Sequence, residues 1–512
     1  MLSYAEDCSI NDCNFENLGG NAIFVNNYNR NHQINGNLIR NIGASGICFV
    51  GNPDAVRSPL FRYEQSLTYE LLDKTAGPKT NDYPAQCIAK DNLIDHIGTV
   101  EKQTAGVQIS MASEIIVSYN TIYNTPRAGI NISEGTWGGH IIEFNEVFNT
   151  VLETGDHGAF NSWGRDRYWN PNRNYIDSIA AAHPELILLD AQKTTIIRNN
   201  IFRCDHGWDI DLDDGSSNYH IYNNICLNGG LKLREGFYRT VENNILINNT
   251  FHPHVWFKNS GDTFKHNIVS LPYAPIGISN APITIDSNFF LTPKGLEKAK
   301  AMGTDAHSIY GDADFKNANI GDYQVTANST AFKVGFQNFD HNIGVQSPRL
   351  KKIAQRALIS SMLINEHASE PNTTYTWLDA KLKNIVGLGE RSAAGLPDED
   401  GVLLLEAGKG VAARSGLIAG DVIRGVEGEK IKEVTDLFQA IKKNEWKRTV
   451  KLLVFRNQAD NLKTVSEIES AGGRAFQTVA ELTRPEECEK AIKTIVEKFG
   501  LINGLVNNAG VK

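Results

Sequence analysis

A short acidic run near the middle of the chain, residues 208–215, carries the densest group of reactive side chains. It reads Trp-Asp-Ile-Asp-Leu-Asp-Asp-Gly. Because side chains alternate between the two faces of a β-strand, Asp209, Asp211 and Asp213 are predicted to share one face. A later run, Gly-Leu-Lys-Leu-Arg-Glu-Gly at 230–236, places two cations at the matching offsets. The two runs are therefore predicted to be neighbouring strands whose charges compensate one another.

Paired carboxylates at this spacing suit acid–base chemistry on a glycosidic bond. Hydrolysis needs one carboxylic acid to protonate the leaving oxygen and a second carboxylate as base or nucleophile. A polar stretch at 155–167 is expected to abut the same strip one repeat earlier and adds two further Asp residues. The candidate catalytic residues are Asp156, Asp166, Asp209, Asp211 and Asp213. The alternative is that the carboxylates only form a salt-bridge ladder with Lys232 and Arg234.

Aromatic and basic residues around this strip predict a sugar-binding groove. Indole rings can stack on the apolar faces of a sugar, while its hydroxyls bond to carboxylates and cations. The candidate substrate-binding residues are His157, Trp163, Arg165, Trp208, Lys232, Arg234, Glu235, His254, Trp256 and Lys258, and Trp169 also flanks the strip. The groove is predicted to bind an oligosaccharide or polysaccharide.

The strand pattern recurs along residues 1–292. Branched apolar residues next to Asn-rich corners repeat at intervals of about 20 to 29 residues, which is typical of a solenoid. We expect a mainly β protein built on a right-handed parallel β-helix. The predicted inward column contains Ile130, Ala159, Ile210, Leu231 and Val255, with Asn161 as a polar exception in the neighbouring apolar column. Two longer intervals predict surface loops near 52–86 and 164–192.

Three further segments follow the predicted solenoid. Residues 293–379 are expected to close it, with a helical linker at about 347–367 that could serve as a cap. Residues 380–458 contain Gly-Leu-Ile-Ala-Gly-Asp-Val-Ile at 416–423 and a helical run at 436–442. This segment resembles an α+β PDZ domain of bacterial proteases, which implies a module that packs on the β-helix or binds a peptide.

The last segment, residues 459–512, ends in Leu-Val-Asn-Asn-Ala-Gly-Val-Lys. It resembles the middle of a short-chain dehydrogenase, as a short α/β fragment. The Gly-rich turn that holds the cofactor pyrophosphate is missing, and so is the catalytic Tyr and Lys pair. We expect no dehydrogenase activity and interpret the segment as the remnant of a gene fusion or of a sequence assembly error.

The motifs of the strip carry a family resemblance. Asp-His-Gly-Ala-Phe-Asn-Ser-Trp-Gly-Arg-Asp at 156–166, Trp-Asp-Ile-Asp-Leu-Asp-Asp-Gly-Ser-Ser-Asn-Tyr at 208–219 and His-Pro-His-Val-Trp-Phe-Lys at 252–258 resemble glycoside hydrolase family 141. That family includes α-L-fucosidases and xylanases. The resemblance implies two Asp residues on neighbouring coils, one from 156 or 166 and one from 209, 211 or 213. It also implies a secreted or periplasmic protein.

The α-L-fucosidase activity is favoured within this family by the carboxy-terminal segment. Its dehydrogenase-like sequence weakly resembles enzymes that oxidise free sugars such as L-fucose, and genes for consecutive steps are often neighbours in bacteria. Two other functions stay open. A polysaccharide lyase would use the Asp cluster for Ca²⁺ and Lys232 or Arg234 as base. A non-catalytic β-helix would only bind a glycan.

Composition narrows the remaining classes. The net charge of −9 gives no basic stripe, so nucleic acid is not an expected partner. No run of apolar residues is long enough to predict a membrane span. The first residues do not resemble a signal peptide and enter a coil directly, so we expect that an amino-terminal part is missing. The seven cysteines are dispersed and predicted to be reduced, with a Cys8–Cys13 pair as the alternative. No resident cofactor is predicted.

Overall fold

The computed structural model describes residues 1–134, 137–274, 284–340, 342–362, 374–396, 398–444, 446–447 and 450–456. The chain divides into two compact units. Unit 1 contains residues 1–370 together with 387–393, and unit 2 contains 371–386 and 394–512. The dehydrogenase-like segment predicted at 459–512 lies outside the described residues.

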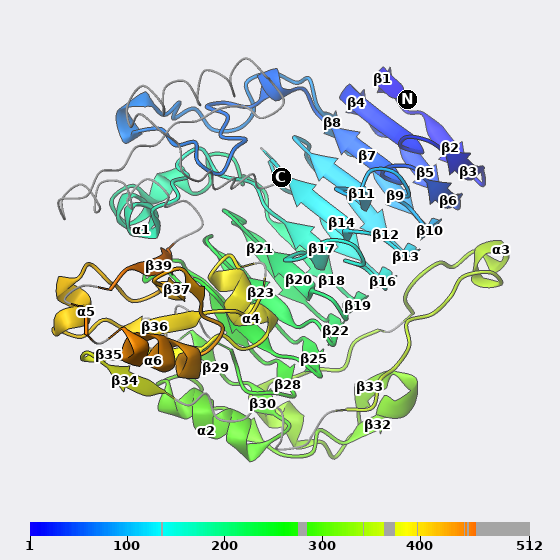
Figure 1. The fold of residues 1–512 in the computed structure, drawn as a ribbon. Helices are drawn as coiled ribbons and strands as arrows, with labels where there is room; N and C mark the ends of the chain where they lie inside the picture. Colours follow the sequence, from blue (N-terminus) through cyan, green and yellow to red (C-terminus); the bar gives the residue numbers. More distant parts are fainter. Residues whose placement is uncertain are drawn as a thin grey trace. The chain divides into compact units, whose positions relative to one another are not determined.

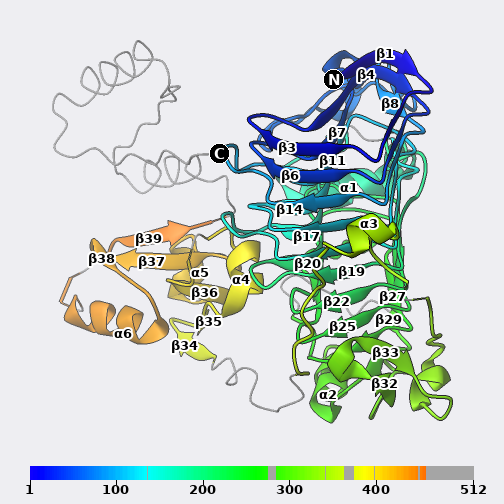
Figure 2. The same cartoon turned by 90° about the vertical axis from the view of Figure 1, so that its right-hand side faces the viewer.

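Unit 1 is a parallel β-helix, as predicted (Figure 1). Successive coils stack on one another and contribute strands to three parallel sheets (Figure 2). The first sheet contains β1 (Leu2–Glu6), β4 (Ile23–Arg30), β7 (Ile47–Val50), β11 (Ala105–Ser110), β14 (Ala128–Ser133), β17 (Gly158–Ser162), β20 (Trp208–Leu212), β23 (Leu231–Leu233) and β26 (Phe251–Pro253), with β8 (Pro84–Ala85) beside β4.

The other two sheets complete each coil. The second sheet contains β2 (Ser9–Asn11), β5 (Gln33–Asn35), β9 (Ile88–Lys90), β12 (Ile116–Ser118), β15 (Ile141–Glu143), β18 (Thr195–Arg198), β21 (Tyr219–Tyr222), β24 (Arg239–Glu242), β27 (Thr263–Lys265) and β29 (Ile285–Asp286). The third sheet contains β3 (Asn14–Leu18), β6 (Leu38–Ile42), β10 (Leu93–Asp95), β13 (Thr121–Tyr123), β16 (Glu146–Phe148), β19 (Ile201–Arg203), β22 (Ile225–Leu227), β25 (Ile245–Ile247), β28 (Ile268–Val269), β30 (Phe289–Phe290) and β31 (Ile309–Tyr310).

A ladder of buried asparagines fixes the corner before the third sheet. Each side-chain oxygen accepts hydrogen bonds from the coil before it; Asn120 Oδ1, for example, lies 2.9 Å from both the backbone nitrogen and Nδ2 of Asn92. The ladder contains Asn37, Asn92, Asn120, Asn145, Asn200, Asn224, Asn244, Asn267 and Asn288. Because a buried amide is costly unless it is paired, this ladder holds successive corners in the same register.

The register of β17 differs by one residue from the prediction. Phe160, rather than Ala159, aligns with Ile130 and Ile210 in the inward column. A one-residue slip exchanges the two faces of a strand. Asn161 therefore belongs to the outward row and is not a polar exception among apolar residues.

The next strand after β23 also differs from the prediction. Leu231 aligns with Phe251, because β26 spans Phe251–Pro253. The predicted place of Val255 in the inward column was therefore wrong. Val255 packs instead with Phe257 in a separate apolar cluster formed by the two long loops.

Those loops occupy the two predicted long intervals. The first carries the short helices η1 (Pro53–Ala55) and η2 (Tyr69–Leu71), and the second carries α1 (Arg173–Ala182) and η3 (Pro184–Leu186). The indole nitrogen of Trp169 donates a hydrogen bond of 2.9 Å to the carbonyl oxygen of Tyr63. Their shared apolar cluster makes the two loops one packed layer.

The closing segment begins with α2 (Pro293–Ala301), β32 (Phe315–Asn317), η4 (Ala318–Ile320), β33 (Asp322–Val325) and η5 (Thr330–Val334). Residues 337–340 and 342–361 form the two arms of a strap that follows the third sheet towards the first coils and returns. Its partners on the way out are Asn243, Phe144, Thr121, Asp91 and Gly36, and on the return Glu146 and Asn248. The predicted helical linker was wrong in its described part, since helix is limited to α3 (Pro348–Lys351).

Unit 2 has an antiparallel sheet in the order β34 (Tyr375–Trp377), β35 (Ala380–Asn384), β36 (Val402–Glu406), β37 (Val422–Val426) and β38 (Glu429–Lys430), with β39 (Leu452–Phe455) paired to β37. Its helices are α5 (Val411–Arg414) and α6 (Val434–Lys443), while α4 (Gly387–Ala393) groups with unit 1. A core that includes Leu404, Ile423 and Leu437 joins this sheet to α6.

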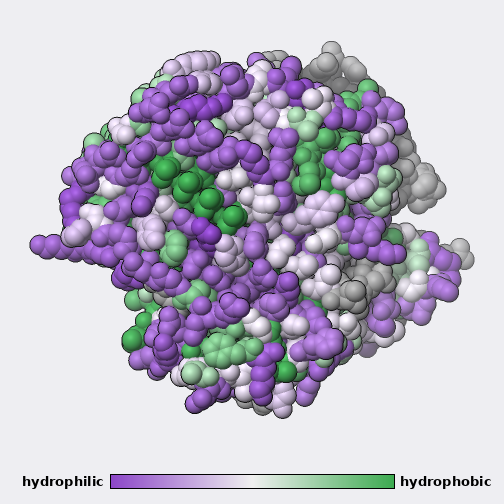
Figure 3. Space-filling view, turned by 180° about the vertical axis from the view of Figure 1, so that it is seen from behind, coloured by the Kyte–Doolittle hydropathy of each residue, from purple (hydrophilic) through white to green (hydrophobic). Residues whose placement is uncertain are grey.

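The surface seen in Figure 3 is dominated by hydrophilic residues, with hydrophobic residues in small separate patches. Among the described residues, no helix is both long and apolar enough to cross a membrane. Cys8 and Cys13 are both free thiols in the structure.

Candidate active site

One outward row of the first sheet changes its chemistry along the β-helix. Strand pairing places Gln108, Asn131, Asn161, Asp211, Lys232 and His252 at successive positions of this row. The first three are neutral amides, and the last three are titratable. The predicted direct pairing of Asp211 with Lys232 is therefore confirmed.

Lys232 is the hub of the titratable half. Its Nζ lies 2.9 Å from Asp211 Oδ1, 3.2 Å from Asp156 Oδ1 and 3.8 Å from Asp213 Oδ1. The side chains of Lys232 and Asp211 are 0% exposed, whereas those of Asp156 and Asp213 are 36% and 20% exposed. Asp156 reaches this cluster from the corner before β17, where its φ of 54° turns the chain sharply. One ammonium group thus serves three carboxylates.

The pKa values of two of these carboxyl groups are shifted in opposite directions. Burial raises the pKa of Asp211 well above its ordinary value, and the charges of Asp213 and Asp156 add to that effect against the pull of Lys232. Burial also opposes ionisation of Asp156, but the nearby Lys232 and Arg234 lower its pKa below the ordinary value. Burial disfavours the Lys232 ammonium, yet the carboxylates outweigh it and raise the pKa of Lys232. Two carboxyl groups whose pKa values are shifted in opposite directions therefore contact the same cation.

The carboxyl group of Asp211 makes no aligned hydrogen bond with a described residue, although its ion contact with Lys232 is short. The Lys232 ammonium therefore offsets part of the desolvation of this buried carboxyl group.

A second cluster continues from the first through Arg234. Its guanidinium lies 3.1 Å from Asp213 Oδ1, 3.5 Å from Asp214 Oδ1 and 3.3 Å from Glu235 Oε2. Arg165, from the second long loop, lies 3.3 Å from the other oxygen of Asp214. Burial, followed by the charge of Asp213, raises the pKa of Asp214 to about 7.

Two of the predicted catalytic residues hold the scaffold instead of joining the Lys232 cluster. Asp209 accepts hydrogen bonds of 2.7 and 2.8 Å from the backbone nitrogens of Cys204 and Gly229, and another of 2.8 Å from that of Gly230. These bonds fix the corners before β20 and β23.

Asp166 is the second of these scaffold residues. It accepts hydrogen bonds from the Tyr168 hydroxyl at 3.0 Å and from the Ser217 hydroxyl at 3.1 Å. Burial, together with the charge of Asp190, raises the pKa of its carboxyl group well above the ordinary value. Asp166 therefore fastens the second long loop to the neighbouring coil.

Of the tryptophans predicted to stack on a sugar, most are buried in the scaffold and one is half-buried beside the strip. Trp256 belongs to the main core beside Phe251, and Trp169 to the loop cluster. Trp208 is 1% exposed and packs edge-on against His252 and His254, with Lys232 Nζ 5.2 Å from its ring centroid. Trp163 is half-buried, and the Arg165 guanidinium lies 5.0 Å from its ring centroid. Trp163 is thus the predicted indole best placed to meet a sugar.

The remaining predicted residues surround the clusters to different degrees. His157 is half-buried and bonds to the Thr154 hydroxyl at 2.9 Å, and burial lowers its pKa to about 3. His254 is buried, and neither of its ring nitrogens has a hydrogen-bond partner among the described residues. Glu235 is held by Arg234 and Arg173, the latter at 2.5 Å. Lys258 is exposed.

Arg127 was not predicted from the sequence. It is 7% exposed, its Nε has no hydrogen-bond partner among the described residues, and burial lowers its pKa to about 10 against the charges of Asp211, Asp213 and Glu134. Its position just before β14 lies outside the alternating pattern of the strand, so periodicity does not point to it. The feature of the sequence that could have pointed to Arg127 is a single cation between Pro126 and an apolar strand.

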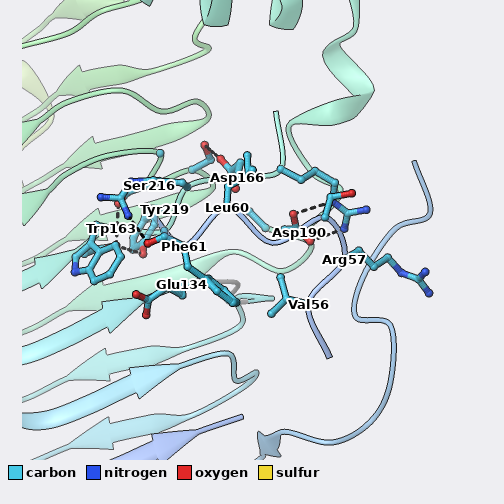
Figure 4. Close-up of a pocket in the computed structure, with 18 residues that line it drawn as sticks. Val56, Arg57, Leu60, Phe61, Glu134, Trp163, Asp166, Asp190, Ser216 and Tyr219 are labelled. Atoms are coloured by element: carbon cyan, nitrogen blue, oxygen red, sulfur yellow. Dashed lines mark hydrogen bonds and ion pairs between the residues drawn. The ribbon is translucent and has the colours of Figure 1, made fainter. Parts of the chain in front are cut away.

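A small cavity lies beside the strip, where both long loops meet the coils (Figure 4). Leu60 and Phe61 approach from the first loop and Trp163 and Asp166 from the coil and second loop, while the Arg57 guanidinium points away and bonds to Asp73. Its volume of about 30 Å³ has room for roughly one water molecule. Asp156 and Asp213 are half-buried outside this cavity, and the Ser392 hydroxyl of α4 donates a hydrogen bond to Asp156 Oδ1. Among the described residues, no group of three or more His, Cys, Asp or Glu is arranged to hold a metal ion.

Comparisons with known proteins give one family match and weak structural likenesses. Residues 439–512 match the family model described as short chain dehydrogenase. A solved structure described as "Glycoside hydrolase" is 11% identical over 54% of this chain and 37% of its own, with a TM-score of 0.29. Another, "a new PL6 alginate lyase complex with trisaccharide", is 10% identical over 56% of this chain and 58% of its own, with a TM-score of 0.23. This chain spans less than two thirds of either protein.

Proposed function

We propose that the β-helix is a glycoside hydrolase whose acid–base pair is drawn from the carboxylates around Lys232. The supporting observation is that Asp156 and Asp211 both contact Lys232 Nζ while their pKa values are shifted in opposite directions. Glycoside hydrolysis needs one protonated and one ionised carboxyl group at the same bond.

The pKa directions suggest the individual roles. Asp211, whose pKa is raised by burial, is assigned as the acid that donates to the leaving oxygen. Asp156, ionised and partly exposed, is the base or nucleophile. Asp213 and Arg234 would bond to sugar hydroxyls, and the half-buried Trp163 would stack on an apolar sugar face. Lys232 maintains the difference between the two acids.

An α-L-fucoside is our first proposed substrate, and xylan is the second. This choice rests on the resemblance of the motifs at 156–166, 208–219 and 252–258 to glycoside hydrolase family 141. The same resemblance supports a secreted or periplasmic location. Unit 2 is proposed to be a PDZ-like module, supported by its antiparallel sheet and by the packing of α6 on it.

A polysaccharide lyase is the alternative enzyme, favoured by the row of cations that could bind an acidic sugar. Its base would be Lys232 or Arg234, and a base must be neutral to accept a proton. Neighbouring carboxylates overcome the effect of burial and raise the pKa of both groups. Because the raised pKa values disfavour a neutral Lys232 or Arg234, we propose hydrolysis ahead of elimination.

The purified full chain should be tested against aryl glycosides, including an α-L-fucoside, and against xylan and alginate. Aryl release or new reducing ends without ultraviolet absorbance from unsaturated sugars would support a hydrolase, whereas that absorbance would favour a lyase. Asp156→Asn and Asp213→Asn should each lose activity while keeping the melting temperature. Asp7→Asn, an exposed residue of the first coil, is the matched control and should keep full activity. Cleavage of none of these glycans would favour a binding protein.

A further inference from the structure

Helix α4 contacts the titratable half of the outward row, although it is far from that row in sequence. It groups with unit 1, whereas the residues on both sides of it, 371–386 and 394–512, group with unit 2. The Ser392 hydroxyl of α4 donates a hydrogen bond to Asp156 Oδ1. A Cβ atom at Gly389 would lie 3.2 Å from His252 Nδ1 and 3.7 Å from Trp208 Cη2. Two neighbours of Lys232, namely Asp156 and His252, therefore contact α4.

The two oxygens of the Asp156 carboxylate are held differently. Oδ1 accepts hydrogen bonds from the Ser392 hydroxyl and, at 3.2 Å, from Lys232 Nζ. Oδ2 accepts no hydrogen bond from a described residue, and the side chain of Asp156 is 36% exposed. Ser392 is 2% exposed, and a buried hydroxyl is costly unless it is paired, so its bond to Asp156 is fixed. The carboxylate is thus anchored through one oxygen and presents the other in a defined direction.

Ser392 is the neutral member of the group that acts on Asp156. Burial opposes ionisation of Asp156, but the charge of Lys232, then the Ser392 hydrogen bond and then Arg234 lower its pKa. The charged or titratable groups that interact with Asp156 are Lys232, Arg234, Asp211, His157 and His254. Removing the Ser392 hydroxyl therefore changes how Asp156 is held without changing the number of charges around it.

We propose that Ser392 is a positioning residue of the glycosidase, which holds Asp156 Oδ1 so that Oδ2 is directed at the anomeric carbon or at the attacking water. This inference rests on the proposed role of Asp156 as base or nucleophile. As base, Oδ2 takes a proton from water while the water oxygen bonds to the anomeric carbon; as nucleophile, Oδ2 forms that bond itself, and water later replaces it. In both cases the glycosidic bond breaks, its electron pair stays on the leaving oxygen, and that oxygen takes the proton of Asp211.

Ser392→Ala removes the donor and tests the positioning role in catalysis. On any glycan that the parent chain cleaves, kcat should fall by about 10- to 100-fold, as expected for a lost hydrogen bond to a charged group, with KM within about twofold. Ser392→Thr keeps the hydroxyl and should restore most of kcat. Ser415→Ala is the matched control, because its exposed hydroxyl donates to the Val411 carbonyl oxygen, and this variant should equal the parent.

Carboxyl labelling tests the same hydrogen bond without any glycan. A carbodiimide reacts with the protonated form of a carboxyl group, and the Ser392 hydrogen bond lowers the pKa of Asp156. Ser392→Ala should therefore speed the labelling of Asp156, followed by mass spectrometry, by about tenfold, while Ser392→Thr and Ser415→Ala should not. Gly389→Leu, whose side chain would meet His252, should displace α4 and speed the labelling as well.

The outcomes separate this inference from the proposed function. A parent chain that cleaves no glycan refutes the glycosidase, whereas the labelling rates still decide whether Ser392 holds Asp156. The positioning role is overturned if Ser392→Ala leaves the labelling rate unchanged, if it raises KM alone, or if Ser392→Thr is as slow as Ser392→Ala at the melting temperature of the parent. A higher kcat in Ser392→Ala or Gly389→Leu also overturns it, because α4 would then block the strip.

Discussion

The two halves of one outward row of the first sheet have the same backbone geometry and opposite chemistry. In the amide half, Asn131 Nδ2 donates to Gln108 Oε1 at 2.9 Å, and Asn161 Nδ2 donates to Asn131 Oδ1 at 3.2 Å. In the titratable half, Asp211 and Lys232 share an ion contact, and the Asp211 carboxyl group has no aligned hydrogen bond among the described residues.

This difference separates stability from reactivity. In the amide half, the side chains form hydrogen bonds with one another, and these bonds keep adjacent coils in register. Buried charges are held at a cost in desolvation, and that cost is what displaces the pKa of Asp211 upwards. The amide half is therefore expected to be structural, and the titratable half to be the place where chemistry occurs.

The largest effect on activity is expected when an amide replaces the first carboxyl group of the titratable half. Asp211→Asn keeps the size of the side chain but cannot supply a proton, so kcat/KM on any cleaved glycan should fall by about 10²- to 10⁴-fold. The melting temperature should stay close to that of the parent, since burial, which raises the pKa of Asp211, favours a neutral side chain at this position. An unfolded Asp211→Asn variant would instead support the salt-bridge ladder.

Removing the hub should come next. Lys232→Met leaves Asp156, Asp211 and Asp213 without their shared cation, and breaking a buried ion pair costs about 3 to 5 kcal/mol. Urea denaturation at neutral pH measures this loss, which should shrink at acidic pH as the carboxylates become protonated. Lys258→Met, at an exposed lysine, is the control and should change stability little. Equal losses in the two variants would refute the role of Lys232 as hub.

A smaller effect is expected from breaking the amide half. Asn131→Leu leaves Gln108 Oε1 and Asn161 Nδ2 without their described partner, which should cost about 1 to 3 kcal/mol. Specific activity per folded molecule should not change, because Asn131 touches none of the carboxylates around Lys232. Urea denaturation and an activity assay on the same sample test both statements, and a lost activity would contradict the division into two halves.

The smallest effect concerns pH. The pKa of Asp214 is about 7 in the folded chain against an ordinary 3.8, so the folded state binds more protons between these values. Its contribution to stability is complete below pH 3.8 and is lost as the pH rises through 7. Asp214→Asn cannot ionise and should gain in melting temperature relative to the parent between pH 5 and 8, by on the order of 2 °C. A difference that is constant with pH would contradict the raised pKa.

The sequence by itself determined the repeat, the strands and one decisive pair. Alternating apolar residues and asparagine corners recur because each coil must bury the same face, so the solenoid could be predicted from period alone. Asp211 and Lys232 were aligned correctly because both strands carry two apolar residues flanking the charge in the same phase.

Only the tertiary structure decided the exact register elsewhere and the role of each carboxylate. Phe160 took the place predicted for Ala159, a one-residue slip that exchanges the faces of the strand. Phe251 took the place predicted for Val255, because β26 spans Phe251–Pro253 and so lies earlier in the chain than expected. Asp209 turned towards the backbone nitrogen of Cys204, while Asp156 reached Lys232 across 76 positions of sequence. Periodicity is a property of one strand, whereas the pKa of a carboxyl group depends on burial and on charges that the fold brings from distant coils.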